Sequence, residues 1–159
     1  MGAIRIVWGT ATGPTAMASY DAALADGNVH NYNLVTVSSV IPADGEIEVI
    51  GEAPDLGPAG ERLTVVQGRK TAPPGGEEPA VAGLGWNREP DGPGIFYETS
   101  GTDSEEVTDD LEAGLEAGRE LREWNFGDEG RRLVVAESDP EAYSTAVVLA
   151  VYGHSEPLL

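Results

Sequence analysis

The stretch NYNLVTVSSVIP, residues 31–42, decides how the rest of the chain is interpreted. Three apolar residues at its centre predict a strand over residues 31–39. The strand ends in two adjacent hydroxyls, Ser38 and Ser39, and Pro42 prevents a regular continuation. A serine pair at the end of a strand is commonly a turn that hydrogen-bonds its own backbone. The remaining sequence must therefore decide whether this pair is a turn or a reactive site.

Length and composition limit the possible classes of protein. A chain of 159 residues is long enough for one domain with a substantial core. The absence of cysteine excludes disulfides, zinc–thiolate sites and thiol nucleophiles. Only two histidines, His30 and His154, are present, which leaves little for a histidine metal site or a Ser-His-Asp triad. No run is long enough to span a bilayer and no signal sequence opens the chain, so we expect a soluble, cytoplasmic protein.

The strongest global feature is charge, with 28 acidic residues against 9 basic ones and a net charge of −19. Such a surface repels phosphate backbones, which argues against nucleic-acid binding. A disordered acidic chain is disfavoured, because 40% of the residues are apolar and they fall in strand-like runs. Adaptation to molar salt fits best, since carboxylates repel one another little when the Debye length is about 3 Å. Sparse lysine with abundant Asp, Glu, Gly and Ala is typical of haloarchaeal proteins.

The first part of the chain predicts a strand, a loop and a helix. Alternating apolar residues indicate a strand over residues 4–8, and residues 9–14 are expected to form a plain loop without the spacing of a phosphate-binding motif. Thr15 can cap a helix that Gly27 ends. Asp21 lies on this helix close to its apolar face, where a solvated carboxylate is the commoner explanation.

The rest of the chain alternates between strands and one long helix. Short apolar runs predict six further strands, over residues 46–50, 63–66, 81–86, 95–97, 131–135 and 145–151. The last of these is nearly all apolar and is therefore expected at the centre of a sheet. Thr102 or Ser104 can cap the helix, whose buried face is predicted to contain Val107, Leu111, Leu115, Leu121 and Trp124. Mixed strands with two main helices predict an α+β layered domain.

Several of these segments together resemble the pyruvoyl-dependent arginine decarboxylase family. The resemblance rests on the run LVTVSSVIP, on DAAL at residues 21–24, on YETSG at residues 97–101, on the early GTATG, and on Asn33 six residues before Ser39. It covers essentially the whole chain. It implies a single domain over residues 1–159, folded as a layered αββα sandwich of mixed sheets with two main helices.

In that family the precursor cleaves itself between the two serines. The resemblance implies that Ser39 attacks the carbonyl of Ser38 and is then converted into a pyruvoyl group. Only a residue with a β-oxygen or β-sulfur leaving group allows this conversion. Asn33 matches the asparagine that assists the site. Along an extended strand its side chain would point to the same side as that of Ser39. The products would be a β chain of residues 1–38 and an α chain of residues 39–159.

The resemblance also implies the chemistry of the finished enzyme. L-arginine would form a Schiff base with the pyruvoyl group, lose CO2 and leave agmatine, a precursor of polyamines. Glu98 matches the proton donor, which requires burial to raise its pKa, and the neighbouring Phe96 and Tyr97 make an apolar setting plausible. Asp21 matches the carboxylate that binds the guanidinium group. No metal and no pyridoxal phosphate are implied.

Family members are homotrimers or dimers of trimers with the site between subunits, and no nucleic acid or membrane takes part. His30 and Tyr32 are bulkier than expected ahead of the serine pair and could narrow the pocket. Two alternatives remain open. One is a pyruvoyl decarboxylase of another amino acid, although a carboxylate in the pocket would favour a cationic side chain. The other is an unprocessed, non-catalytic homologue that binds a cationic metabolite.

Overall fold

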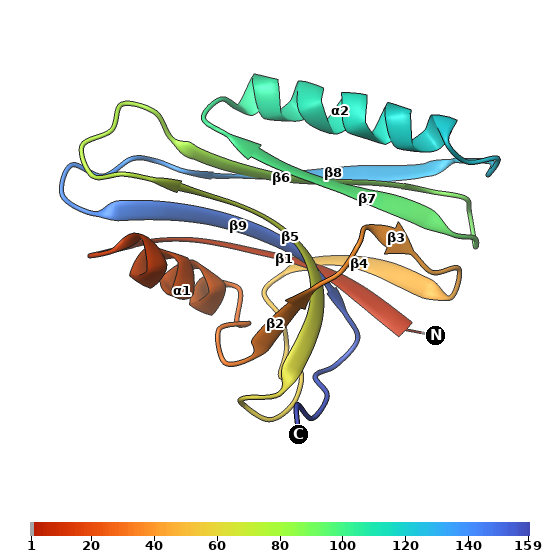
Figure 1. Ribbon diagram of the computed structural model, residues 1–159, viewed down its shortest axis with the longest axis horizontal. Coiled ribbons are helices and arrows are strands. Elements are labelled where there is room, and N and C mark those ends of the chain that lie inside the picture. Colours follow the sequence, from red (N-terminus) through yellow and green to blue (C-terminus); the bar gives the residue numbers. More distant parts are fainter. Residues whose placement is uncertain (1) are drawn as a thin grey trace.

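The computed structural model describes residues 2–159 and consists of two stacked sheets with one helix on each outer face (Figure 1). This arrangement confirms the α+β class and the αββα layering. The elements, in chain order, are β1 (Gly2–Gly13), α1 (Ala16–Asp26), β2 (Asn33–Thr36), β3 (Val40–Ile41), β4 (Gly45–Gly51), β5 (Arg62–Ala72), β6 (Ala80–Arg88), β7 (Gly94–Gly101), α2 (Ser104–Glu120), β8 (Asp128–Ala136) and β9 (Tyr143–Tyr152).

The larger sheet has the strand order β2-β5-β9-β1-β4, and the smaller one has β3-β7-β6-β8. The larger sheet is mixed, because β1 pairs with β4 and β2 pairs with β5 in parallel, whereas β9 is antiparallel to both of its neighbours. The smaller sheet is entirely antiparallel. The prediction of mixed sheets therefore holds for the larger one.

Strand β9 explains why an almost continuous apolar run belongs at the centre of a sheet. Its Val148 and Ala150 face the space between the two sheets, where they pack with Trp86 and Phe96. The alternate residues Val147, Leu149 and Val151 face α1 on the other side. Both faces of the strand are therefore buried, which confirms the central position predicted for residues 145–151.

The prediction of a loop over residues 9–14 is wrong, because β1 continues through Gly13. This part of the strand pairs with the first half of β9, from Gly9 opposite Val147 to Gly13 opposite Tyr143. A Cβ on either glycine would meet the backbone of α1, at Ala23 for Gly9 and near Ser19 for Gly13. The glycines are there for close packing of the helix on the strand, and not for a turn. Thr15 caps α1 and Gly27 ends it, as predicted.

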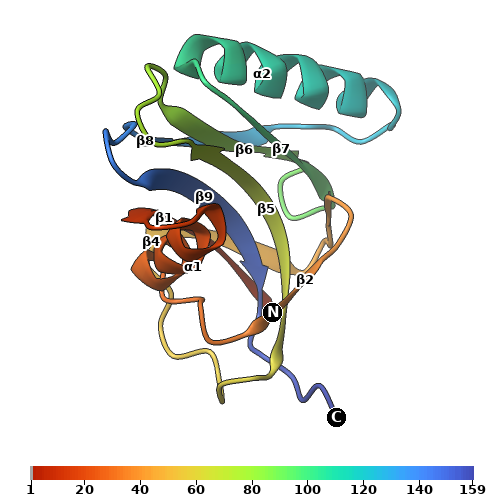
Figure 2. The same ribbon diagram turned by 60° about the vertical axis from the view of Figure 1, so that its left-hand side comes forward.

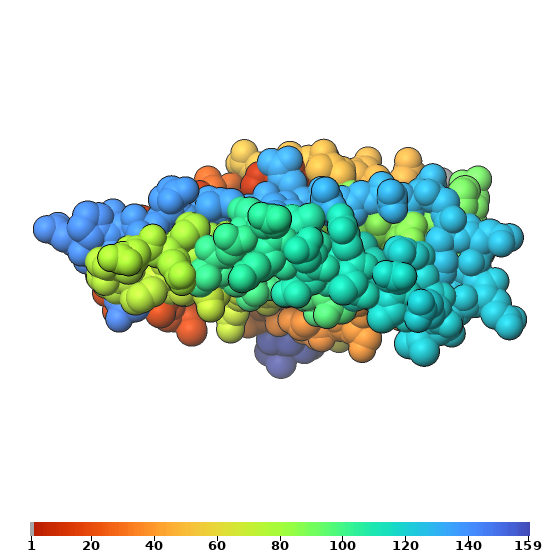
Figure 3. Space-filling model, turned by 90° about the horizontal axis from the view of Figure 1, so that it is seen from above, coloured from red at the N-terminus to blue at the C-terminus, as the bar shows by residue number. Residues whose placement is uncertain are grey.

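Helix α2 lies on the outer face of the smaller sheet, with Val107, Leu111 and Leu115 buried as predicted. Its N-cap is Asp103 and not one of the two flanking hydroxyls, since the Asp103 carboxylate accepts a hydrogen bond from the Glu106 amide at 3.0 Å. The helix ends at Glu120, so the inclusion of Leu121 and Trp124 in its buried face was wrong. Seen from above, α2 lies along the middle of an elongated molecule (Figure 3). Its exposed residues are mostly acidic, which is the solvated charge expected of a salt-adapted surface.

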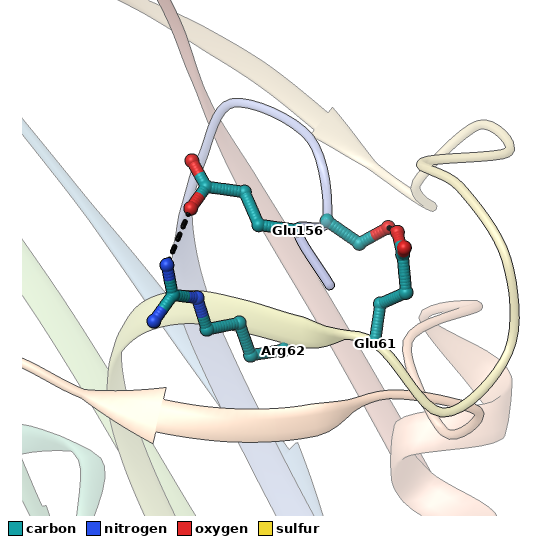
Figure 4. Close-up of polar contacts among 4 residues, drawn as sticks. Glu61, Arg62 and Glu156 are labelled. Carbon is teal, nitrogen blue, oxygen red and sulfur yellow. Dashed lines mark hydrogen bonds and ion pairs between the residues drawn. The ribbon is translucent and has the colours of Figure 1, made fainter. Parts of the chain in front are cut away.

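The polypeptide passes from one sheet to the other between β2 and β3, and Figures 1 and 2 show this crossing at the open edge of the larger sheet. The regular strand stops at Thr36, three residues earlier than predicted, because Ser38 and Ser39 belong to the crossing. The C-terminal segment packs beside the first residue of β5, where Arg62 and Glu156 form an ion pair at 2.8 Å (Figure 4). Neither helix within residues 2–159 combines the length and apolar character that crossing a bilayer requires.

Candidate active site

The crossing segment brings Ser39 against Glu98 of β7. The Ser39 hydroxyl donates a hydrogen bond to Oε2 of Glu98 over 3.1 Å, although 59 residues separate them in the chain. Both side chains are half-buried, and Ser38 beside them is exposed. Two residues singled out separately in the sequence are therefore in direct contact.

The backbone around Ser39 is held in a tight turn. The Val40 amide donates to the Ser38 carbonyl over 3.0 Å, so three residues close a small ring centred on Ser39. The Phe96 amide of β7 donates to the Ser39 carbonyl over 2.8 Å. Residue 39 therefore has both its own carbonyl and the preceding carbonyl fixed by backbone donors.

Glu98 points into the space between the sheets. It shares a face of β7 with Phe96, which belongs to the apolar layer there. The larger sheet comes close at this point, because a Cβ on Gly68 of β5 would lie 2.9 Å from the Gly83 carbonyl oxygen and 3.6 Å from the Cβ of Glu98. Tyr97 faces the opposite way and covers Gly114 of α2, so its expected place in the setting of Glu98 was wrong. Strand alternation separates the two side chains.

The aromatic residue that does accompany Glu98 is Tyr152, at the end of β9. Its hydroxyl donates to the Val40 carbonyl over 3.1 Å, and its ring meets the Phe96 ring edge-on with centroids 6.3 Å apart. Burial raises the pKa of the Tyr152 phenol to about 12, and the nearby negative charge of Glu98 adds to the shift. Sequence reasoning missed this residue. The available signal was a phenol at the end of an apolar strand, whose hydroxyl needs a partner when it is buried.

The raised pKa predicts how this tyrosine ionises. In the unfolded chain the phenol loses its proton near pH 10, whereas in the folded protein it keeps the proton up to about pH 12. Its contribution to stability is therefore complete below pH 10 and is lost as the pH rises to about 12, because the unfolded state binds fewer protons in that window. In a spectrophotometric titration, the difference between the intact protein and a Tyr152→Phe variant should show one phenol that ionises near pH 12. A difference curve centred at pH 10 would contradict this environment.

Asn33 is not brought to the serine pair within one chain. It opens β2, is exposed, and donates from its side-chain amide to the Gly60 carbonyl over 2.8 Å. Its face parity with Ser39 has no consequence here, because the strand ends at Thr36 and the chain then leaves the sheet. The prediction that Asn33 assists Ser39 has no contact to support it in a single subunit.

Asp21 also lies apart from the Ser39–Glu98 pair. It is exposed on α1, and that helix packs on the outer face of the larger sheet, whereas Glu98 lies between the two sheets. Figure 1 shows α1 and the crossing segment on different parts of the molecule. An exposed carboxylate with this placement is open to a ligand or to another molecule.

Comparison with known proteins gives the context of this geometry. The family model described as pyruvoyl-dependent arginine decarboxylase (PvlArgDC) matches residues 3–157. This chain belongs to that family. A protein of Halobacterium salinarum named pyruvoyl-dependent arginine decarboxylase is 48% identical over 157 residues, which cover 98% of this chain and 96% of that protein. A protein of the same name from Pyrococcus furiosus is 34% identical over 148 residues, with 89% and 90% covered.

Membership in the pyruvoyl-dependent arginine decarboxylase family implies a covalent pyruvoyl group that the chain generates from its own residues. The residues present fit that group. Ser39 offers a β-hydroxyl with a carboxylate acceptor in contact, and the carbonyl before it already accepts an amide donor. The similarity to a protein from Halobacterium salinarum is consistent with the salt-adapted, acidic composition of this chain.

Proposed function

We propose that this protein decarboxylates L-arginine to agmatine and CO2, using a pyruvoyl group made from Ser39. The observation that carries the proposal is the contact between the Ser39 hydroxyl and Glu98. It joins a residue able to become the reactive group with a carboxyl group able to carry a proton. The family and the names of its relatives supply the substrate and the reaction. Agmatine production would serve polyamine biosynthesis in the cytoplasm.

Self-cleavage would begin with the Ser39 hydroxyl. Its oxygen forms a bond to the Ser38 carbonyl carbon, the amide bond between the two residues breaks, and the hydroxyl proton reaches the released nitrogen. Glu98 is placed to take that proton first, since its Oε2 already accepts the hydroxyl hydrogen bond. Elimination at residue 39 followed by hydrolysis would then give chains of residues 1–38 and 39–159.

In the finished enzyme, the pyruvoyl group would supply an electron sink for loss of CO2. The role of Glu98 is to hold a proton and give it to the substrate carbon after CO2 leaves. The apolar layer around Phe96 keeps bulk water from the inner side of this carboxyl group. The Phe96 amide would continue to fix the carbonyl of residue 39, which is a neighbour of the reacting centre.

The substrate side of the site would need a second subunit. Around the serine pair three valines are unusually exposed, with relative exposures of 42% for Val35, 36% for Val37 and 46% for Val40. Val35 lies on β2, Val37 follows it in the crossing, and Val40 begins β3. Strands β2 and β3 are edge strands of the two sheets, so this region offers unpaired backbone groups and apolar area to another copy. We infer a homotrimer, or a dimer of trimers, in which Asp21 and Asn33 of one copy approach Ser39 of the next. We propose that Asp21 binds the substrate, because it matches the family's guanidinium-binding carboxylate and because a carboxylate can bind a guanidinium group in a bidentate manner.

Replacement of Asp21 tests this assignment. Asp21→Asn should raise the KM for arginine by about tenfold to a hundredfold, because a charge-assisted contact is lost while the proton donor is untouched. Steady-state agmatine production in molar KCl provides the measurement. Asp109→Asn, which makes the same change at an exposed position of α2, is the matched control and should leave KM unaltered. If the two variants behave alike, Asp21 does not bind the guanidinium group.

The direct test of function is an assay of the purified protein against a panel of amino acids in molar KCl. We expect CO2 release from arginine and its cationic analogues alone. Faster turnover of an acidic or neutral amino acid would favour the pyruvoyl decarboxylase of another substrate. A chain that remains whole and inactive would favour a binding protein for cationic metabolites.

A further inference from the structure

Three successive carbonyl groups at the cleavage site are each held by a different donor. The Ser38 carbonyl accepts the Val40 amide over 3.0 Å, and the Ser39 carbonyl accepts the Phe96 amide over 2.8 Å. The Val40 carbonyl accepts the Tyr152 hydroxyl over 3.1 Å. The first two donors are backbone groups. Tyr152 is the side chain in this set, so its contribution can be removed by substitution without altering the backbone.

We propose that Tyr152 is a positioning residue for self-cleavage, which holds Val40 so that the Val40 amide points at the Ser38 carbonyl oxygen. The inference rests on the proposed cleavage between Ser38 and Ser39. In this step the backbone amide of Val40 is the hydrogen-bond donor to the oxyanion. The Tyr152 hydroxyl keeps that amide in the orientation it needs.

The chemistry of the step explains why such a donor matters. When the Ser39 oxygen adds to the Ser38 carbonyl carbon, negative charge develops on the Ser38 carbonyl oxygen. The amide that already donates to this oxygen can stabilise the charge without reorganisation. Collapse of the adduct breaks the amide bond, leaves an ester between Ser38 and the Ser39 oxygen, and places the proton on the released nitrogen. No further reactant is needed for this step.

The orientation of the Val40 amide depends on the two peptide groups that flank Val40. The preceding group is tied to β7 through the Phe96 amide. The following group is tied to β9 through the Tyr152 hydroxyl, and also to β7 through the pairing of β3 with Gly94 and Ile95. Val40 itself is 46% exposed, so its own side chain does little to fix it within one subunit. Without the Tyr152 hydroxyl, the tie to β9 is lost and the turn is held by β7 alone, so the turn gains freedom.

The Tyr152 ring is held firmly enough to act as an anchor. It packs against the apolar layer between the sheets and touches Phe96 edge-on. Its strand is the central one of the larger sheet, where Tyr152 pairs with Ile4. Its phenol remains protonated, and so remains a donor, throughout the neutral range. The anchor therefore belongs to the rigid part of the fold, whereas the turn it holds belongs to the crossing between sheets.

The test compares Tyr152→Phe with Tyr143→Phe, which removes a phenol hydroxyl from the opposite end of the same strand. Each chain is synthesised as the precursor in molar KCl, and the fraction cleaved is followed over time by intact mass. We expect Tyr152→Phe to cleave about tenfold more slowly than wild type and still reach completion, whereas Tyr143→Phe should match wild type. Slow completion shows a folded chain with a misaligned turn. An unchanged rate for Tyr152→Phe would overturn the proposal. A permanent block would overturn it as well, because a misoriented donor slows the step but removes no reacting group.

Treatment with hydroxylamine shows whether Tyr152 acts on the formation of the ester or on a step after it. The reagent cleaves the ester between Ser38 and the Ser39 oxygen but leaves the amide intact. Added to the Tyr152→Phe precursor, it should release no early burst of fragments, because the slow step is the formation of the ester. A burst would show that the ester accumulates and that Tyr152 acts afterwards, which would overturn the assignment. Failure of wild type to cleave under the same conditions would count against the proposed function itself, and is a different outcome.

Discussion

Ser39→Ala should leave the protein as one uncleaved chain of 16.6 kDa with no decarboxylase activity. Alanine has no β-oxygen, so it can neither attack the Ser38 carbonyl nor form the group that replaces residue 39. The fold should be retained, because Ser39 is only half-buried and its side chain contributes one hydrogen bond, to Glu98. Intact mass and agmatine production, both measured in molar KCl, check the two halves of this expectation.

The neighbouring serine provides the matched control. Ser38 contributes its carbonyl group to the proposed cleavage and its side chain is exposed, so Ser38→Ala should still yield two chains. Two chains from Ser39→Ala would show that the bond that breaks lies elsewhere. A block in both variants would show that the hydroxyl of residue 38 takes part as well.

Glu98→Gln should separate cleavage from turnover. The amide oxygen of the substituted side chain can still accept the Ser39 hydroxyl hydrogen bond, so the turn should keep its geometry and the chain should cleave, if more slowly. An amide cannot hold and release the proton that the substrate carbon needs, so kcat should fall roughly 100- to 10,000-fold. The measurement is the rate of agmatine formation per cleaved chain, which corrects for any loss of processing.

The control for this variant is Glu105→Gln, which makes the same change at an exposed position in the first turn of α2. It should cleave and turn over like wild type. Full activity in Glu98→Gln would remove Glu98 from proton donation and would leave Tyr152, with its hydroxyl beside the same turn, as the group to examine next.

The fold was predictable wherever local pattern and tertiary structure agree. The apolar run of β9 and the buried face of α2 at Val107, Leu111 and Leu115 were recognised for this reason. The extension of β1 was not, because Gly9 signals a turn in isolation and its real role depends on the approach of α1. The cap of α2 was misassigned because three adjacent polar residues can each serve, and only the geometry selects Asp103.

The candidate site was predictable in part through the family resemblance. Ser39 and Glu98 were named separately, and the structure places them in contact. The neighbourhood of Glu98 was not predictable, because strand alternation sends Tyr97 to α2 and because Tyr152 comes from 112 residues after Val40. No local pattern contains such a long-range contact. Asn33 and Asp21 remain predictions, since their proposed partners lie on another copy of the chain.

The central claim is that the bond between Ser38 and Ser39 breaks without any other protein and leaves a keto group on residue 39. The most direct measurement is the intact mass of the purified wild-type protein in molar KCl, before and after borohydride treatment. The account predicts two fragments, of residues 1–38 and 39–159, and predicts that only the larger one gains the mass of two hydrogen atoms on reduction. A single species of 16.6 kDa, unchanged by the reagent, would contradict it.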